Sequence, residues 1–303
     1  MASPTVLVLG SGGYMGRQIM AQLRERDATA VGADVRLTED GVVDYAFDMR
    51  FPYQTLALMQ QIRPDVVISL GYVLTVELYA NVQNAVHANV LGVNGVFDAA
   101  AAVGVPRVVF ASSNPVYGAQ SDFGDAEITE DSPRHPRVLY ALMKQFNEDM
   151  ATFYNQSSAT TIVTVILSSL HGRNKGGIFN PLDMLVTAAG TTRNFTLPWS
   201  ATHEFSFLHV DEAAQIFVEL ALAPQLQWTT YNSGGERLTM AELAAVAAPL
   251  CGLTVGFDEP GRHLAHCSRL NSDRLRSELP ISRRSVEDWI RIELQRVGKS
   301  QQN

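Results

Sequence analysis

The sequence predicts a doubly wound α/β fold, in which one parallel β-sheet carries helices on both faces. Over the first two-thirds of the chain, short runs rich in β-branched residues alternate with stretches of helical spacing. The short runs are apolar without interruption, which is typical of strands buried on both faces. The first run, residues 5–9, leads into a glycine-rich loop, and a helical stretch follows at once.

The remaining elements can be assigned in order along the chain. In residues 15–26, Met15, Ile19, Met20 and Leu23 share one face of a predicted helix. Proline at position 52 suits the first turn of the next predicted helix. We expect further strands at 28–34, 43–48, 65–70, 107–113 and 160–167, and further helices at 52–62, 74–103 and 138–155.

The alternation of predicted strands and helices becomes irregular after Leu167, where glycine, proline and tryptophan residues interrupt it. Residues 205–210 are a predicted strand, and Asp211 is expected to cap a helix that continues through Leu222. We therefore expect a larger domain of residues 1–167 and about 203–232. A smaller, discontinuous domain would comprise about 168–202 and 233–303.

Composition narrows the class of protein. The 303 residues carry a net charge of −8 and 46% hydrophobic residues, as expected for a soluble globular chain. An acidic chain without a basic run is a poor candidate for binding nucleic acid or an anionic membrane. The longest apolar stretch is broken by charges and a proline, so no membrane span is expected. Two cysteines cannot form a disulfide framework, and the absence of a signal peptide adds to the expectation of a cytoplasmic protein.

The loop after the first strand is a candidate phosphate-binding site. Gly10, Gly13 and Gly16 follow a G-x-x-G-x-x-G spacing, although glycines also occur in loops simply to form turns. In this strand–loop–helix context, backbone N–H groups and a helix N-terminus can hold a phosphate. Asp34 ends the second predicted strand, where an acidic side chain accepts ribose hydroxyls and favours NAD over NADP. Arg36, two residues on, leaves NADP open.

Three other residues form a candidate catalytic group. Tyr140 and Lys144 are spaced i, i+4, which places them on one helix face, although such pairs also arise by chance. A neighbouring ammonium would favour phenolate and lower the phenol pKa, so that the phenol could remove a hydroxyl proton. Ser113 ends a predicted strand at the carboxyl edge, where such sheets bind ligands, and could orient the same oxygen.

Several motifs in the same order make the chain similar to the extended short-chain dehydrogenase/reductase family, the NAD-dependent epimerase/dehydratase group. The resemblance covers nearly the whole chain and implies a Rossmann domain that binds NAD and a smaller substrate domain. The matching segments are the glycine loop at 10–16, F-D-M at 47–49, N-V-L-G-V-N at 89–94, S-S-N-P-V-Y-G at 112–118, Y-A-L-M-K at 140–144, H-V-D-E at 209–212 and Y-N-S-G at 231–234.

The resemblance also implies roles for individual residues. Backbone groups of Gly13, Tyr14 and Met15 would hold the pyrophosphate, and Asp34 the adenosine ribose. Lys144 would also bind the nicotinamide ribose. Further cofactor contacts would come from Asp48 and Met49 near the adenine, Leu70, Gly71 and Tyr72 along the cofactor floor, and Asn89 near the nicotinamide.

The chain departs from the nucleotide-sugar members of this family. The stretch I-L-S-S-L-H-G at 166–172 lacks their Arg and Asn, and Asn114-Pro115 replaces the Asp-Glu pair of the dehydratases. The run A-S-S-N at 111–114 resembles the uronate dehydrogenase branch, whose Arg on the next strand is also missing. Candidate substrate contacts are Tyr72, Asn114, Ser169, His171 and Arg262.

Three functions remain open from the sequence. We expect an NAD-dependent oxidoreductase acting on a secondary hydroxyl of a sugar-like or hydroxy-acid substrate. The alternatives are a nucleotide-sugar epimerase and, less favoured, a non-catalytic dinucleotide sensor. His263, His266 and Cys267 lack an acidic partner, so we expect no metal. Trp199 could stack on substrate or simply pack, and the Ala-rich helices at 84–103 and 138–155 could form a homodimer interface.

Overall fold

The computed structural model describes residues 3–172, 180–262 and 266–300 of the chain. Its centre is a seven-stranded sheet in the order β10-β6-β5-β4-β1-β2-β3, and every neighbouring pair is parallel. The strands are β1 (Thr5–Leu9), β2 (Thr29–Asp34), β3 (Tyr45–Ala46), β4 (Val66–Ser69), β5 (Arg107–Ser113), β6 (Thr161–Leu167) and β10 (Thr230–Asn232). This arrangement confirms the predicted fold class.

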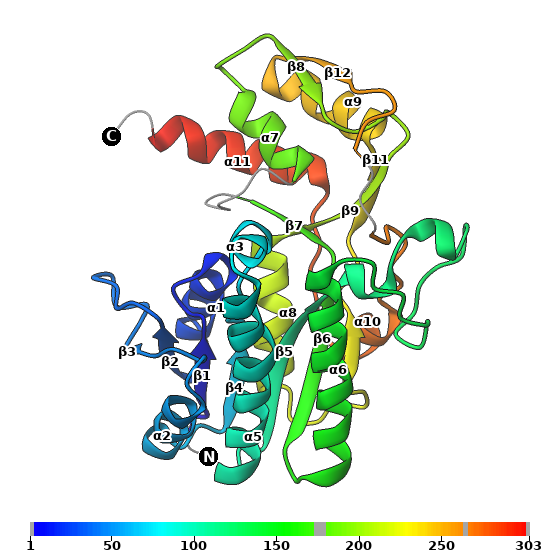
Figure 1. Ribbon diagram of the computed structural model, residues 1–303. Coiled ribbons are helices and arrows are strands. Elements are labelled where there is room, and N and C mark those ends of the chain that lie inside the picture. Colours follow the sequence, from blue (N-terminus) through cyan, green and yellow to red (C-terminus); the bar gives the residue numbers. More distant parts are fainter. Residues whose placement is uncertain (1–2, 173–179, 263–265, 301–303) are drawn as a thin grey trace.

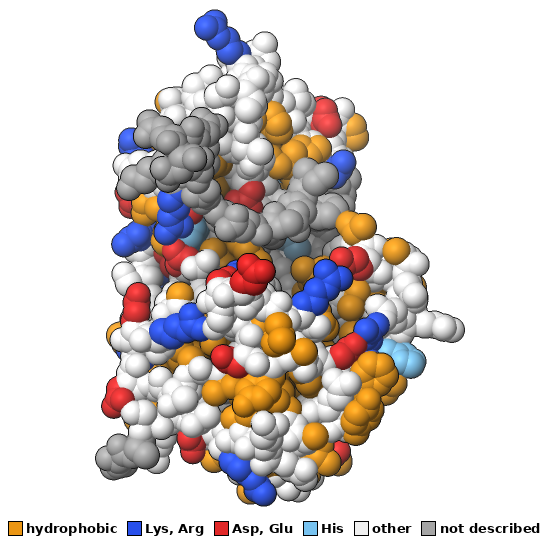
Figure 2. Space-filling view, turned by 90° about the vertical axis from the view of Figure 1, so that its left-hand side faces the viewer, with side chains coloured by type: hydrophobic (Ala, Val, Ile, Leu, Met, Phe, Trp, Pro, Cys, Tyr) orange, Lys and Arg blue, Asp and Glu red, His pale blue; other side chains and the backbone are white. Residues whose placement is uncertain are grey.

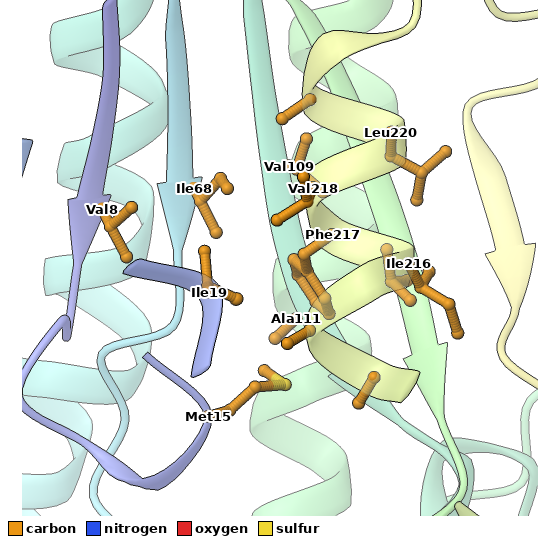
Figure 3. Close-up of a cluster of buried hydrophobic side chains, with 14 of the residues drawn as sticks. Val8, Met15, Ile19, Ile68, Val109, Ala111, Ile216, Phe217, Val218 and Leu220 are labelled. Carbon is orange, nitrogen blue, oxygen red and sulfur yellow. The ribbon is translucent and has the colours of Figure 1, made fainter. Parts of the chain in front are cut away.

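Helices cover both faces of this sheet (Figure 1). On one face lie α1 (Tyr14–Arg24) and α8 (Val210–Leu222), and on the other α2 (Pro52–Ile62), α5 (Val93–Val103) and α6 (Leu139–Ser157). Each face has its own apolar core, since side chains of a strand alternate between the two. Figure 3 shows the first core, where Ile19 of α1 lies near Ile68 of β4 and Phe217 of α8 lies near Ala111 of β5.

The long helix expected at 74–103 is divided. It consists of α3 (Thr75–Ala80), α4 (Val82–Val86), a π-helical turn η1 (His87–Gly92) and α5. By length and composition Val82–Val103 could cross a membrane, but buried Val93, Val96 and Phe97 pack in the core beneath the sheet. The part of the stretch that forms α5 is thus a core helix of this fold. The strand expected at 43–48 is shorter, since only Tyr45 and Ala46 pair with β2.

A smaller lobe lies at the carboxyl edge of the main sheet (Figure 1). It contains a three-stranded sheet in the order β11-β9-β7 and a two-stranded sheet of β12 and β8. Its core is built from α7, α9, α11 and these strands. The elements are β7 (Ser169–His171), α7 (Pro181–Ala188), β8 (Asn194–Leu197), β9 (Glu204–His209), β11 (Glu236–Thr239), α9 (Met240–Cys251), β12 (Thr254–Phe257) and α11 (Val286–Ser300). Short helices are η2 (Asn114–Tyr117), η3 (Gln120–Asp122) and α10 (Asp273–Glu278).

Residues 203–232 contribute elements to both lobes. Within residues 203–232, β9 pairs with β7 and β11 of the small sheet, whereas α8 and β10 join the main sheet. Asp211 does not cap α8. The cap is His209, whose Nδ1 accepts the N–H of Asp211 at 3.1 Å, because the helix begins two residues earlier than expected.

On the face shown in Figure 2, neither positive nor negative charge dominates. There, basic and acidic side chains are interspersed, and hydrophobic side chains gather on the lower part of the molecule. This distribution matches the modest net charge of −8.

Candidate active site

The glycine loop is folded tightly on itself and against the neighbouring strand end. Gly10 has φ +89°, and a Cβ there would approach the backbone nitrogen of Gly71 to 2.9 Å. A Cβ on Gly16 would come within 2.1 Å of the carbonyl oxygen of Gly10. These two positions therefore require glycine for the fold itself.

The same loop leaves backbone donors available at the start of α1. The N-cap is Gly13, and no side chain caps the helix. Among the described residues, the N–H groups of Tyr14, Met15 and Gly16 have no acceptor, whereas the N–H of Arg17 bonds the carbonyl of Gly13. Unpaired donors at the positive end of a helix suit the pyrophosphate of a dinucleotide, so these residues fit NAD.

Asp34 is fixed beside this loop by backbone donors. Its Oδ2 accepts the N–H of Gly12 at 3.0 Å and its Oδ1 the N–H of Val35 at 2.7 Å. The carboxylate thus lies where the loop and the end of β2 meet, and ribose recognition by Asp34 stays a prediction. Arg36 is exposed.

The predicted adenine and floor residues are brought together below the loop. Met49 is buried, and a Cβ on Gly71 would reach its Sδ at 2.7 Å, so Met49 packs directly against the turn after Leu70. Asp48 is already paired inside the chain, since Arg50 Nε donates to both carboxylate oxygens at 2.9 Å. This pairing lowers the pKa of Asp48. Adenine contact by Asp48 stays a prediction.

Asn89 binds the backbone of the segment that follows β4, where the predicted cofactor-floor residues lie. It lies buried in the π-helical turn, where its Oδ1 accepts the N–H of Val73 at 2.7 Å and its Nδ2 donates to the carbonyl of Val73 at 2.9 Å. Both polar atoms of the amide are therefore used to hold the segment that contains Tyr72. The expected contact of Asn89 near the nicotinamide stays a prediction.

The structure brings Ser113, Tyr140 and Lys144 together. Ser113 ends β5 at the carboxyl edge, and Tyr140 and Lys144 lie on the first turns of α6. The Ser113 side chain lies beside the Tyr140 phenol, whose pKa it acts to lower. Lys144 is buried, and its Nζ donates to the carbonyl oxygen of Ala111 at 2.6 Å.

Burial dominates the electrostatics of this group. It raises the pKa of Tyr140, and the Ser113 hydroxyl works in the opposite direction. The phenol pKa is therefore raised, and not lowered as the spacing to Lys144 predicted, because desolvation outweighs the other effects. Burial lowers the pKa of Lys144 to about 7, and the carboxylate of Glu148 opposes this shift.

Two features of the site were not found from the sequence. The first is the placement of the Tyr72 ring, which lies over Lys144 Nζ at 3.4 Å and meets the Tyr140 ring edge-on at 5.5 Å. The second is buried Glu148, one turn beyond Lys144, which accepts hydrogen bonds from Ser112 Oγ and from Arg134 Nε, the latter at 3.0 Å. Polar residues at 144, 147 and 148 on the buried face of α6 were the available signal for Glu148.

The candidate substrate residues are distributed between the lobes. Asn114 follows β5 and donates to the carbonyl of Cys267 at 2.9 Å. Ser169 and His171 lie on β7, with the His171 ring 5.1 Å from that of His209. Arg262 is exposed, and its backbone N–H bonds the carbonyl of Pro198 at 2.8 Å. The structure thus brings Asn114 to the strand end beside Ser113, whereas Arg262 belongs to the small lobe.

Trp199 packs in the core of the smaller lobe and does not stack on a substrate. Its side chain is fully buried and meets the ring of Phe205 edge-on at 5.3 Å, so it offers no open face for substrate. His263 lies outside the described residues. Within those ranges, no group of three His, Cys, Asp or Glu side chains could hold a metal ion.

Comparison with known proteins places this geometry in context. The sequence model of the NAD dependent epimerase/dehydratase family matches residues 6–234. A uronate dehydrogenase of Pseudomonas syringae pv. tomato is 42% identical over 84 residues, covering 27% of this chain and 29% of the relative. UDP-glucuronate 4-epimerase 4 of Arabidopsis thaliana is 25% identical over 192 residues, covering 55% of this chain and 42% of the relative. The chain therefore spans less than half the length of either curated relative.

Solved structures share the fold at low sequence identity. A partial consensus L-threonine 3-dehydrogenase has a TM-score of 0.86 at 16% identity, covering 98% of this chain and 100% of that one. The UDP-glucose 4-epimerase of Thermus thermophilus, in complex with NAD, has a TM-score of 0.80 at 20% identity, covering 96% and 98%. The family model, which matches most of the chain, confirms the resemblance to the extended short-chain dehydrogenase/reductases, and the cofactor of this family is NAD. With the glycine loop, Asp34 and the Ser113, Tyr140 and Lys144 group in place, the chain belongs to the NAD-dependent epimerase/dehydratase family.

Proposed function

We propose that the protein oxidises a secondary hydroxyl of a sugar-like or hydroxy-acid molecule, with Tyr140 as the base. The observation that carries this proposal is the placement of Ser113, at the end of β5, beside Tyr140 of α6, with Lys144 one turn along the same helix. These groups lie at the carboxyl edge of the sheet, where ligands bind in such folds. The uncapped start of α1 opens at the same edge.

Each residue has a distinct task in the proposed reaction. The Ser113 hydroxyl holds the substrate oxygen, and the Tyr140 oxygen receives the proton of the substrate hydroxyl. Lys144 binds the nicotinamide ribose, and its charge favours the phenolate form of Tyr140. Bound NAD supplies the hydride acceptor. The donors at the start of α1 and the Asp34 carboxylate orient the dinucleotide.

Substrate choice rests on the departures from the nucleotide-sugar pattern. Residues 166–172 lack the Arg and Asn that those members carry, which favours a small substrate without a nucleotide. The 42% identical segment of a uronate dehydrogenase supports the same choice. An epimerase that returns the hydride to the opposite face is the second candidate, supported by the longer match to a UDP-glucuronate 4-epimerase.

A substrate panel separates these functions. Purified protein is incubated with NAD and uronic acids, aldoses, hydroxy acids or UDP-sugars, while absorbance of free NADH and sugar composition are followed. Net NADH formation from a small hydroxy substrate supports oxidation. Interconversion of UDP-sugars without net NADH supports epimerisation, and no turnover with any of them contradicts both.

We also propose that a second copy of the chain covers the exposed apolar surface of α3, α4, η1 and α6. These elements contact one another, and a large apolar surface in water is unfavourable. The exposed side chains on it are Val76, Tyr79, Val82, Leu91, Leu142, Phe146 and Phe153.

Light scattering of the purified protein tests this dimer, and it should give twice the chain mass of 33.1 kDa. Leu142→Glu with Phe146→Glu should give the single mass, whereas Leu37→Glu, at an exposed position between β2 and β3, should not. A wild-type monomer would contradict the proposal.

A further inference from the structure

The ammonium of Lys144 lies among three aromatic rings. Its Nζ is 3.4 Å from the ring centre of Tyr72, 5.0 Å from that of Phe110 and 5.9 Å from that of Tyr140. The face of an aromatic ring attracts a cation, most strongly where water is excluded. The Tyr72 ring is by far the closest, so it makes the strongest of these contacts.

Other groups around Lys144 cannot replace this contact. Within the described ranges, the carbonyl oxygen of Ala111 is the only hydrogen-bond acceptor of Nζ. The charged group facing it is Glu148 on the same helix, whose carboxylate is engaged by Ser112 and Arg134. Tyr140 on α6, Phe110 on β5 and Tyr72 after β4 complete the surroundings. A buried ammonium with one acceptor is poorly compensated for its lost water.

We propose that Tyr72 is a positioning residue, whose ring face keeps the Lys144 side chain charged and in place beside Tyr140. The inference rests on the proposed function, because it is in that reaction that Lys144 must carry charge. Burial disfavours the ammonium and lowers its pKa to about 7, so at neutral pH the charged fraction responds steeply to any further stabilisation.

The ring, and not the hydroxyl, performs this task. The Oη of Tyr72 is buried and has no hydrogen-bond partner among the described residues. Asn89 fixes the next residue, Val73, through both its backbone N–H and its carbonyl, which holds the Tyr72 backbone in place. The structure therefore holds the aromatic face close to Lys144 while leaving the hydroxyl unused.

The direct test measures the ionisation of Lys144 without turnover. The sequence contains three lysines, Lys144, Lys175 and Lys299, so protein labelled with ¹³C at lysine Cε should give few resolvable signals. Lys144→Arg identifies the signal of interest. In wild type this signal should titrate far below 10.5, the usual pKa of a lysine side chain. Tyr72→Phe should leave the midpoint unchanged, and Tyr72→Leu should lower it by about one pH unit, the worth of a buried cation–aromatic contact.

An isosteric variant covers the case in which Tyr72→Leu fails to fold. Pentafluorophenylalanine at position 72 keeps the ring shape but removes the negative face, so it should lower the midpoint at least as much as leucine. An unchanged midpoint in both the leucine and the fluorinated protein would overturn the proposal.

A kinetic measurement separates this inference from the proposed function. With an active substrate, Tyr72→Leu should shift the pH dependence of kcat, and Tyr72→Phe should restore the wild-type profile. If Tyr140→Phe retains full activity, the proposed function fails, yet the titration of Lys144 still decides the role of Tyr72. If the titration midpoint does not respond to position 72, the inference fails and the proposed function stands.

Discussion

Gly16 lies so close to Gly10 that a Cβ on Gly16 would approach the Gly10 carbonyl oxygen to 2.1 Å. The glycine loop is therefore constrained by its own backbone as well as by a ligand. At Gly13 the corresponding distance is 3.2 Å and φ is −73°, a conformation open to any residue. The two glycines serve different purposes, and substitution should separate them.

Gly16→Ala should destabilise the protein without cofactor by about 1–3 kcal/mol or more, the usual cost of overpacking. Gly13→Ala should cost less stability but weaken NAD at least tenfold, or about 1.4 kcal/mol, because its methyl group enters the space before the helix donors. Urea unfolding and NAD titration by calorimetry measure the two effects. Equal NAD affinity in wild type and Gly13→Ala would remove Gly13 from the cofactor site.

Asp34 should determine cofactor choice. We expect NAD to bind at least tenfold more tightly than NADP, since the carboxylate repels a 2′-phosphate. Because Asp34 also accepts the N–H of Gly12, Asp34→Asn is the cleaner change: it removes the charge while retaining an acceptor. The affinity ratio, from competitive calorimetry, should narrow in Asp34→Asn and stay unchanged in Arg36→Ala. If the ratio changed in Arg36→Ala and not in Asp34→Asn, Arg36 would be the residue that determines the preference between NAD and NADP.

Tyr140→Phe should lower kcat by roughly 10²–10⁴, the usual contribution of a positioned base. Stability and NAD affinity should barely change, because only the phenol oxygen is lost. Tyr154→Phe, on the same helix and bonded to Asp98, is the matched control and should retain activity. A steady-state kcat for Tyr140→Phe close to that of wild type would exclude it as the base.

The buried amine of Lys144 should make stability depend on pH. Its pKa is about 7 in the folded protein against 10.5 for a free lysine, so between these values the unfolded chain binds one more proton. Stability should therefore rise with pH across that window, by about 1.4 kcal/mol per pH unit. Lys144→Met should remove this slope relative to wild type, as measured by urea unfolding from about pH 7 to 9.5, within the window that the two pKa values define. Parallel curves for the two proteins would show that the amine is solvated when folded.

Local signals explain what the sequence could predict. The alternation of buried strands and helices, the spacing of Gly10, Gly13 and Gly16, and the i, i+4 pair of Tyr140 and Lys144 are all patterns within short segments. These patterns predicted the sheet, the glycine loop and the pair of Tyr140 and Lys144 on one helix. Ser113 was placed correctly at a strand end because the carboxyl ends of parallel strands meet at one edge.

What the sequence could not predict depends on contacts between distant segments. Tyr72 and Lys144 belong to different elements, and the 3.4 Å approach of ring and ammonium follows from their packing. The direction of the Tyr140 pKa shift required knowledge of burial, which spacing alone does not give. The cap at His209 in place of Asp211 reflects a helix start that differs by two residues.

The π-helical turn at His87–Gly92 makes the length of this segment matter as much as its residue types. A π turn holds one more residue than an α turn. Deleting any one residue from it would restore regular spacing and rotate the preceding helix by about 100° relative to α5. Asn89 would then lose both bonds to Val73. Insertions and deletions should therefore be tolerated far less here than in the exposed connection between β2 and β3, whatever residues they add or remove.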